Sequence, residues 1–519
     1  MRILFLEFDA RVDASGAVRR FYFCSKLGYN HPQAAAFYEA RIGEGAMQFE
    51  ERFPVDLWNA NDVESGAGYV QLINTDGALD DLPRYGYGTE AQLWYGAREQ
   101  APSARVAVFN GLVDRIETSR EVLTVYFKSR DAELDQPFMS ATFLGTNQAS
   151  TGVEGLEADI KGQLKPRLVG SCRNISPQLV QSSILTYAWN YRRDGTTAPS
   201  SAPTAYRVGA DPYATINSAV TTQAALEAAS PAAGTVTPCA PESLLRLGTK
   251  PNLPMTMDVA SSVTALRDII PFLLQDAGVS LTRYDASGMT ALGDIANYTA
   301  GMYVREEMNT RSVINRFLSS VGARLTHSPL GVYRVQMLTA PTDTPLYRLK
   351  SRNGQAASDD SELDMVSLDV VSASELVNPA YAVELRYDQN FTPMRVADFA
   401  GIVTAANREP YIQPSRSVIK ENAARVQFPN AVRRVFETYL TQTAQAESQA
   451  VRFLSLFGSR RQQYTALVRA DISVATALKL GVTVSVVDSR FGLKNGKNAV
   501  VIYRKYDAMS ELLTLTIME

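Results

Sequence analysis

The chain has 519 residues, of which 45% are hydrophobic and 20% charged, and its formal net charge is -3. A chain of this length and apolar content predicts about two to four globular domains. The small acidic balance excludes a protein that binds nucleic acid or an anionic membrane through an overall basic surface.

Few of the side chains needed for metal and acid–base chemistry are present. There are three cysteines (Cys24, Cys172 and Cys239) and two histidines (His31 and His327), all far apart. Cysteines this sparse predict buried free thiols rather than a disulfide framework or a zinc site. Two distant histidines make a catalytic triad or a two-histidine metal site hard to build. We therefore expect no enzyme, no metal and no cofactor.

The N-terminal stretch MRILFLEFDAR has an apolar run too short for a signal peptide. No apolar stretch approaches the roughly 20 residues that cross a bilayer. We expect a chain made in a cytoplasm, with no membrane-spanning segment.

Residues 1–140 predict an N-terminal, barrel-like β domain. Apolar runs at 2–8 and 18–23, separated by the turn DASG, predict a hairpin. The segment 30–43 predicts one short helix. Further strands are expected at 69–73, 91–95, 105–110, 112–118 and 122–128, and this spacing is typical of a small barrel or sandwich.

Residues 141–260 change character. Repeated Gly and Pro with little periodicity predict an extended connecting region packed over neighbouring domains, with a surface excursion near 209–240.

Residues 261–340 predict an α+β insertion domain. One helix is expected after a cap at Ser261 or Ser262, with Pro271 kinking or splitting it. A second begins with Thr310 as its cap and ends at Gly322, and a hairpin follows.

Residues 341–519 predict a C-terminal β domain with one long helix at about 436–457, closed by Gly458. Strands are expected at 381–387, 463–468, 482–487, 499–505 and 512–517, with Asn495-Gly496 as a turn. The fold class is therefore mixed and mainly β, with α+β insertions and small barrel or sandwich domains.

The acidic stretch from Asn74 to Asp81 was tested as a calcium loop. An EF-hand loop needs oxygen ligands at positions 1, 3 and 5, Gly at 6 and Glu at 12. Counted from Asn74, the sequence has Ala78 at the fifth position and Tyr85 at the twelfth, so the pattern fails. Because Asn74 and Asp76 can bond their own downstream backbone, the stretch predicts a structural loop.

Asp359, Asp360, Glu362 and Asp364 are the only crowd of candidate acids for a glycan hydrolase or a peptidase. Adjacent residues of a strand point to opposite faces, so solvated charge is the simpler interpretation.

Three aromatic residues, Tyr85, Tyr87 and Trp94, suit either of two roles. They can stack on a sugar, or they can fill a barrel core or a contact between subunits. A passing contact with DNA through paired arginines also stays open, the pairs being Arg19-Arg20, Arg192-Arg193, Arg433-Arg434 and Arg460-Arg461.

Five stretches carry a family resemblance: GYVQLINTDGALDDLPRYGYGTEAQLWYG (68–96), VFNGLVDRIETSREVLTVYFKSRDAELDQPF (108–138), FLGTNQASTGVEGLEADIKGQLKPRLVGSCRNISPQLV (143–180), LLRLGTKPNLPMTMDV (244–259) and GVTVSVVDSRFGLKNGKNAVVIYRKYD (481–507). They resemble phage and prophage tail hub (baseplate or tail-tip) proteins. In that family a strand ending in Asn-x-Asp-Gly-x-Leu-Asp leads to a second strand ending in Gly.

The resemblance implies paired small β-barrels with α+β insertions and a homotrimeric ring that closes the tail tube in the virion, at the tail tip. The implied partners are copies of the chain itself, the distal tail protein, the tape-measure protein, tail fibre or tip proteins and, transiently, phage DNA. Two alternatives are a distal tail or receptor-binding protein that contacts a carbohydrate or pilus, and a tail-associated glycan hydrolase.

Overall fold

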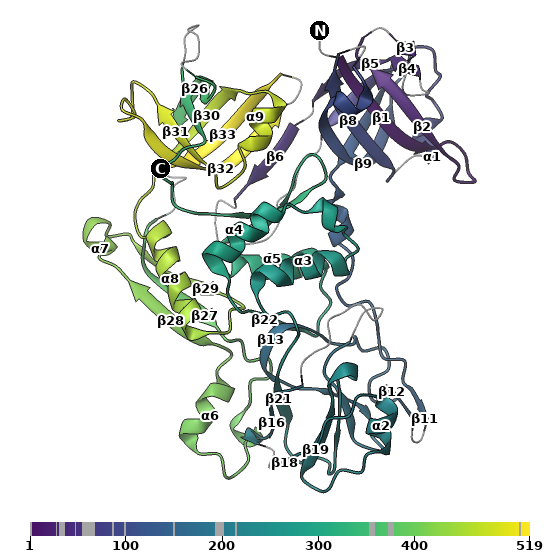
Figure 1. Ribbon diagram of the computed structural model, residues 1–519, viewed down its shortest axis with the longest axis vertical. Coiled ribbons are helices and arrows are strands. Elements are labelled where there is room, and N and C mark those ends of the chain that lie inside the picture. Colours follow the sequence, from purple (N-terminus) through teal and green to yellow (C-terminus); the bar gives the residue numbers. More distant parts are fainter. Residues whose placement is uncertain are drawn as a thin grey trace.

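The computed structural model describes residues 3–26, 28–30, 37–46, 48–53, 68–85, 88–97, 100–148, 151–191, 202–212, 215–351, 359–371, 378–507 and 510–519. The protein is mainly β, which confirms the predicted fold class. Two β modules lie at one end of the molecule, a third β unit lies at the other end, and helices fill the middle (Figure 1).

The N-terminal module is a nine-stranded sheet built from β1 (Ile3–Arg11), β2 (Val18–Cys24), β3 (Tyr29–Asn30), β4 (Phe37–Ala40), β5 (Ile42–Ala46), β7 (Tyr69–Ile73), β8 (Glu90–Gly96), β9 (Val106–Thr118) and β10 (Val122–Lys128). The strands follow the order β3-β4-β2-β1-β8-β9-β10-β7-β5. The predicted hairpin is confirmed, since β1 and β2 pair antiparallel and Gly16 between them has a φ of 83°.

Two expectations for this module were wrong. Within the segment 30–43, residues 37–40 form β4 instead of a helix, because they pair with β2 and β3 and bury Tyr38. Residues 31–36, with His31, lie outside the described residues. The predicted strands 105–110 and 112–118 are one strand, β9. It continues through Gly111, where a Cβ atom would lie 2.6 Å from the Lys128 carbonyl oxygen of the neighbouring strand.

The C-terminal module is a closed barrel of six strands: β25 (Tyr347–Lys350), β26 (Glu362–Val370), β30 (Gln463–Arg469), β31 (Thr483–Val487), β32 (Lys497–Asp507) and β33 (Leu512–Met518). They follow the order β31-β25-β26-β30-β33-β32, and the pairing of β31 with β32 closes the ring. Closure satisfies the backbone groups that an open edge would leave unpaired. The predicted turn is present, with Gly496 at a φ of 79°.

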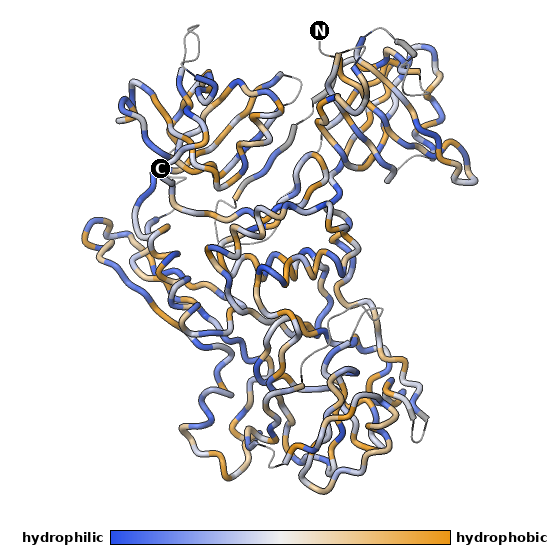
Figure 2. The backbone as a smooth tube through the Cα atoms, in the orientation of Figure 1, coloured by the Kyte–Doolittle hydropathy of each residue, from blue (hydrophilic) through white to orange (hydrophobic). Residues whose placement is uncertain are grey.

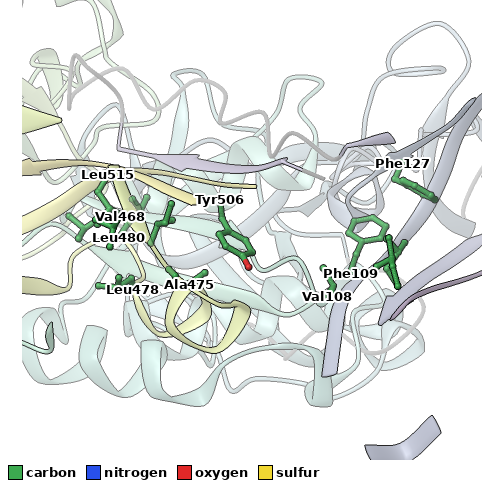
Figure 3. Close-up of a cluster of buried hydrophobic side chains, with 14 of the residues drawn as sticks. Val108, Phe109, Phe127, Val468, Ala475, Leu478, Leu480, Tyr506 and Leu515 are labelled. Carbon is green, nitrogen blue, oxygen red and sulfur yellow. The ribbon is translucent and has the colours of Figure 1, made fainter. Parts of the chain in front are cut away.

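One strand joins the two modules. β6 (Gln48–Arg52) lies between β5 and β7 in sequence, yet it pairs antiparallel with β32 of the C-terminal barrel (Figure 1). The apolar residues of both modules also form a single buried cluster. Figure 3 shows Val108, Phe109 and Phe127 facing Tyr506 and Ala475 across this junction. The two β modules therefore share one core.

The middle of the molecule holds α3 (Leu266–Asp276), α4 (Ala286–Ala296), α5 (Thr310–Ser319) and the hairpin of β23 (Ala323–His327) and β24 (Tyr333–Met337). The expected caps differ from the observed ones. The Ser261 hydroxyl accepts from the Gly170 amide at 2.9 Å, and α3 begins later and runs through Pro271 without splitting. Asn309, not Thr310, caps α5 by accepting from the Ser312 amide at 2.8 Å.

A three-stranded sheet with the order β28-β27-β29 stands beside these helices: β27 (Ala380–Tyr387), β28 (Arg416–Glu421) and β29 (Val432–Glu437). α8 (Thr443–Phe457) packs on one face of it. The helix predicted at about 436–457 therefore begins seven residues too early, because the chain up to Glu437 pairs with β27. Short helices also occur in the chain: α1 (Leu82–Tyr85), α6 (Ala405–Ile412), α7 (Ala424–Gln427) and α9 (Ile472–Ala477).

Residues 141–260, for which we expected an extended course, supply most of the distal β unit. Its elements are β11 (Thr146–Gln148), β12 (Thr151–Leu156), β13 (Arg167–Ile175), β14 (Gln178–Gln181), β15 (Thr186–Ala188), β16 (Ala205–Val208), β17 (Asp211–Pro212), β18 (Thr215–Ile216), α2 (Gln223–Ala228), β19 (Thr235–Cys239), β20 (Leu244–Leu247), β21 (Met255–Ala260) and β22 (Gly301–Val304). They form two five-stranded sheets around the fully buried Trp189, and β11 and β12 form a separate hairpin. The boundaries at 140, 260 and 340 remain predictions.

A buried ion pair lies where β6 meets the C-terminal barrel. Glu51 of β6 is 3% exposed and Arg504 of β32 is 2% exposed. Arg504 Nε lies 3.6 Å from Glu51 Oε2, and Arg504 Nη1 donates to the carbonyls of Ala475 and Leu478 at 2.8 and 3.0 Å. Among the described residues, the Glu51 carboxylate accepts no hydrogen bond. Its burial therefore depends on the positive charges of Arg504 and of the nearby Arg334.

A second ionic contact ties the middle of the molecule to the C-terminal module. Asp285 caps α4 by accepting from the Ser287 amide at 3.0 Å, and its other carboxylate oxygen lies 3.1 Å from Lys479 Nζ. Burial alone would raise the pKa of Asp285, but the hydrogen bonds from Ser287 and Lys479 outweigh it and lower the pKa to about 2. Arg334 of β24 lies 3.7 Å from the same carboxylate, and burial lowers the pKa of Arg334.

We predict that Glu51→Ala lowers the free energy of unfolding by about 3 kcal/mol, because Arg504 would stay buried without its counter-ion. Urea denaturation followed by tryptophan fluorescence and circular dichroism measures the loss. Glu157→Ala is the control, since it breaks an exposed pair with Lys161 and should cost less than about 1 kcal/mol. Equal, small losses in both variants would contradict a buried pair at the junction.

We predict that Asp285→Asn flattens the dependence of stability on pH in acid. The folded-state pKa of about 2 lies below the ordinary 3.8, so the stabilisation is complete above about pH 4 and is lost as the pH falls towards 2. The variant should be less stable by roughly 2 kcal/mol at neutral pH and should lose less on acidification. Thermal midpoints between pH 7 and pH 2 test this. Asp268→Asn removes an exposed carboxylate and is the control; its thermal midpoint should change with pH as that of the unmodified protein does.

Candidate assembly surface

The acidic stretch from Asn74 to Asp81 is a loop held by its own side chains. Asn74 is fully buried; its Oδ1 accepts from the Leu79 amide at 2.9 Å and its Nδ2 donates to Asp80 Oδ1 at 2.7 Å. Gly77 adopts a φ of 71°, which an L-residue would reach only with strain. These bonds turn the chain from β7 towards α1, as the sequence predicts.

Asp76 fixes the same loop to the neighbouring strands. Its carboxylate takes two hydrogen bonds from Arg41 at 2.8 and 2.6 Å, and Arg41 also donates to the Ile73 carbonyl at 3.0 Å. The Arg41 guanidinium holds the pKa of Asp76 well below its usual range. Within the described part of the chain, no three His, Cys, Asp or Glu side chains gather closely enough to hold a metal ion.

The candidate aromatics do not share one environment. Trp94 of β8 stands opposite Phe5 in the sheet and is half-buried against the small apolar cluster of Ile3, Phe5, Cys24 and Tyr38. Tyr85 is half-buried at the end of α1. Tyr87 lies outside the described residues. A sugar-binding role for these side chains stays a prediction.

A polar network that sequence reasoning missed lies beside Trp94. Tyr38 donates to Glu7 Oε1 at 2.5 Å and accepts from Arg105 Nη1 at 3.0 Å, and burial raises the pKa of the Tyr38 hydroxyl. The Arg105 guanidinium lies 3.7 Å from the centre of the Phe5 ring. These residues are far apart in sequence and belong to no motif, so only the sheet brings them together.

The four candidate acids have separate roles. Asp359 accepts from the Ser361 amide at 2.8 Å within a turn, and Asp360 is exposed beside it. Glu362 is 5% exposed at the start of β26, and Asp364 lies 3.5 Å from Arg469.

The described arginine pairs make contacts within the chain. Arg20 lies 3.1 Å from Glu7, and Arg461 donates to the Leu456 carbonyl at 2.7 Å. Arg433 pairs with Glu384, whereas Arg192-Arg193 lies outside the described residues. A contact with DNA stays a prediction.

The outer face of the β28-β27-β29 sheet is the clearest candidate for a contact between molecules. We call it the lateral surface, and it consists of Glu384, Arg386, Ser417, Ile419, Glu421, Arg433, Val435 and Glu437. Ile419 and Val435 flank Glu384 in register and are 44% and 46% exposed. α8 covers the opposite face only. An extended sheet therefore presents aliphatic side chains to solvent on one side.

Ion pairs on the lateral surface lie within β27 and between β27 and β29. Glu384 pairs with Arg433 and lies 3.4 Å from Arg386, which in turn lies 2.6 Å from Glu437. Coulombic attraction to Glu437 is the main cause that raises the pKa of Arg386. Hydrophobic residues also mark the outer tip around α7 in Figure 2, where Val426 is 88% exposed. Exposed aliphatic side chains and paired charges thus stand side by side on this face of the sheet.

No protein-family model and no curated protein sequence matches the chain. Its structure is similar to that of a tail protein from Neisseria meningitidis MC58, at 10% identity and a TM-score of 0.39, over 99% of this chain and 96% of that one. It is also similar to the prophage MuSo2 43 kDa tail protein from Shewanella oneidensis, at 8% identity and a TM-score of 0.40, over 100% and 98% of the two chains.

A third similarity is to a chain in the virion of a native gene transfer agent particle, at 14% identity and a TM-score of 0.38, over 75% of this chain and 91% of that one. Two of these neighbours are described as tail proteins, one of them from a prophage. None of the described helices is both long and apolar enough to cross a membrane.

We predict that Asn74→Ala lowers the free energy of unfolding by about 2 kcal/mol, because the buried Leu79 amide loses its acceptor and the Asp80 carboxylate loses a donor. Chemical denaturation measures the loss, and Asp81→Ala, at an 80% exposed side chain, should change stability by no more than roughly 0.5 kcal/mol. Added calcium should leave the thermal midpoint of the unmodified protein unchanged. A midpoint that rises with calcium would show that the loop binds the ion.

Proposed function

We propose that this chain is a structural subunit of a phage tail: a baseplate or tail-tip hub that assembles with copies of itself into a ring closing the tail tube. The observation that carries the proposal is the lateral surface. Ile419 and Val435 stand exposed on one face of a sheet whose other face is buried, so a flat and partly apolar area is free for another subunit. A closed ring is built from such contacts repeated around an axis.

The construction of the two β modules supports the same role. Their common core and the β6–β32 pairing make them one body, whereas separate barrels would swivel on a linker. A subunit that keeps a tube closed has to hold its shape when neighbouring parts pull on it. Rigidity of this kind is what a hub needs from its fold.

Residues in the stretches that carry the family resemblance also have structural roles in the fold. A Cβ atom on Gly170 would lie 1.9 Å from the Ala300 carbonyl oxygen, so only glycine admits the neighbouring strand. Asn174 is fully buried at a φ of 54°, and its Nδ2 donates to Asn390 Oδ1 and to the Thr392 carbonyl, both at 2.8 Å. These motif residues set backbone geometry and clamp distant segments, which supports a structural function.

In this proposal the chain forms a homotrimer at the tail tip of the virion. It contacts the distal tail protein on one side and tail fibre or tip proteins on the other, and the tape-measure protein and the genome pass through its bore. The proposed role is structural, so no catalytic residue is assigned.

We expect the purified protein to form a closed oligomer, and the double variant Ile419→Asp with Val435→Asp to be monomeric with an unchanged circular dichroism spectrum. Two buried carboxylates would oppose a second subunit, whereas both side chains are solvated in the monomer. Analytical ultracentrifugation measures the size. Val18→Asp, at a 58% exposed strand valine in the N-terminal module, is the matched control and should still assemble.

Two results would contradict the proposal. One is full assembly of the double variant, which would remove the lateral surface from the interface. The other is a chain that stays monomeric inside purified tails, which would remove the ring itself.

A further inference from the structure

We propose that a pocket in the distal β unit binds a neutral N-acetylated sugar unit. The pocket has a volume of about 290 Å³ and lies between β12, the start of β13, the segment after β15 and the turn before β20. This size is close to the lower limit of about 300 Å³ for small-molecule sites, so it suits one sugar ring rather than a long ligand. The inference is independent of the ring proposed above.

Asn190 supplies the first specific group. Its side chain is 7% exposed and lines the pocket, and its Oδ1 accepts from the Leu168 amide at 2.9 Å. That bond fixes the orientation of the amide. In the described structure Nδ2 has no hydrogen-bond partner. A buried donor left unpaired is destabilising, so a carbonyl acceptor brought by a ligand would be favoured there.

Lys165 supplies a second donor in the same pocket. Its ammonium donates to Glu154 Oε1 at 2.6 Å and lies 5.0 and 5.4 Å from the ring centres of Tyr191 and Phe143. Glu154 is itself held, because its Oε2 accepts from the Leu144 amide at 3.0 Å. Since an ammonium group has three protons, Lys165 can donate to a ligand as well. The two donors are therefore pre-positioned.

The charge of the pocket selects against anions. Glu154 and Glu242 contribute two carboxylates to the lining, and Lys165 contributes one positive charge. A ligand that is itself negative would be repelled by the exposed Glu242, whereas sugar hydroxyls can donate to it. The aromatic ring of Tyr191 forms an apolar wall of the kind that sugar rings pack against.

These groups together fit an acetamido sugar. The carbonyl oxygen of its acetamido group accepts from Asn190 Nδ2 and Lys165, while a ring hydroxyl donates to Glu242. A peptide amide offers the same carbonyl but lacks the neighbouring hydroxyls that Glu242 would accept. Binding is non-covalent, and no reaction is assigned to the pocket.

The test is titration of the full-length protein with N-acetylglucosamine, followed by NMR line broadening of the sugar and by calorimetry. We expect saturable binding of this sugar, with glucose, which lacks the acetamido carbonyl, weaker by about tenfold. N-acetylneuraminic acid, which carries a carboxylate, should also bind more weakly. N-acetylglycine methylamide serves as the peptide probe and should not compete.

Substitutions of pocket-lining residues test whether the sugar binds in this pocket. Asn190→Asp keeps the acceptor for Leu168 and replaces the donor by an oxygen, so binding should be lost. A buried carboxylate can itself destabilise the fold, so two variants at more exposed positions, Glu242→Gln and Tyr191→Ala, provide an independent test. Both should weaken sugar binding severalfold with unchanged thermal midpoints. Glu157→Gln, at a 75% exposed side chain, is the control that should bind normally.

The proposal is overturned if N-acetylglucosamine does not bind, or if it binds the three pocket variants as well as it binds the unmodified protein. Equal or tighter binding of the peptide probe would assign the pocket to a peptide instead. If sugar binding is absent but the ring assembles, the pocket proposal fails and the proposed hub function is retained. If assembly is absent but the sugar binds, the proposed hub function fails and the pocket proposal is retained.

Discussion

The pairing of β6 with β32 is the constraint on which the rest of the architecture depends. β6 lies in sequence between β5 and β7, which pair with each other in the N-terminal sheet, yet β6 itself is part of the C-terminal sheet. The chain thus leaves one module, adds a strand to the other and returns. The modules cannot separate unless this strand is withdrawn and the apolar cluster that they share is opened. Both changes expose hydrophobic surface and unpaired backbone groups to water, and both therefore oppose separation.

Apolar burial and buried charge have different roles at this junction. Transfer of a side chain such as Phe109 or Leu515 out of water stabilises the fold by about 2 kcal/mol, and the cluster contains many of them. The Glu51–Arg504 pair gains less, because both ions give up their hydration before they attract each other. We infer that the pair selects the register of β6, since any shift by one residue would bury either charge without its partner. In the same way, the contacts of Asp285 with Lys479 and Arg334 select the orientation of the helical middle relative to the C-terminal module.

Little of the candidate site could be read from the sequence. The Asn74–Asp81 loop could, because Asn, Asp and Gly act on their own local backbone and need no distant partner. The lateral surface could not, since β28 and β29 become neighbours only through β27, and their exposed face is defined by where α8 packs. Asn190 belongs to no sequence motif either. Its unpaired Nδ2 is recognised as part of a site only in the folded chain, where Lys165 and Tyr191 line the same pocket. Trp94 and Tyr85 are close in sequence but lie in different surroundings.

By itself the sequence determined the elements whose apolar residues follow a regular period. β10, β30 and β33 alternate along the chain, α5 repeats its buried face every three or four residues, and Gly16 and Gly496 mark turns that need positive φ. Tertiary structure decided the rest. Residues 37–40 and 432–437 are strands because a partner strand accepts their hydrogen bonds. Residues 141–260 form sheets because local hairpins, such as β14–β15 and β19–β20, are joined by pairings between distant strands, such as β15 with β20 and β13 with β21. Local periodicity reports what a segment buries, whereas pairing between distant strands is decided by which backbone edges the folded chain brings together.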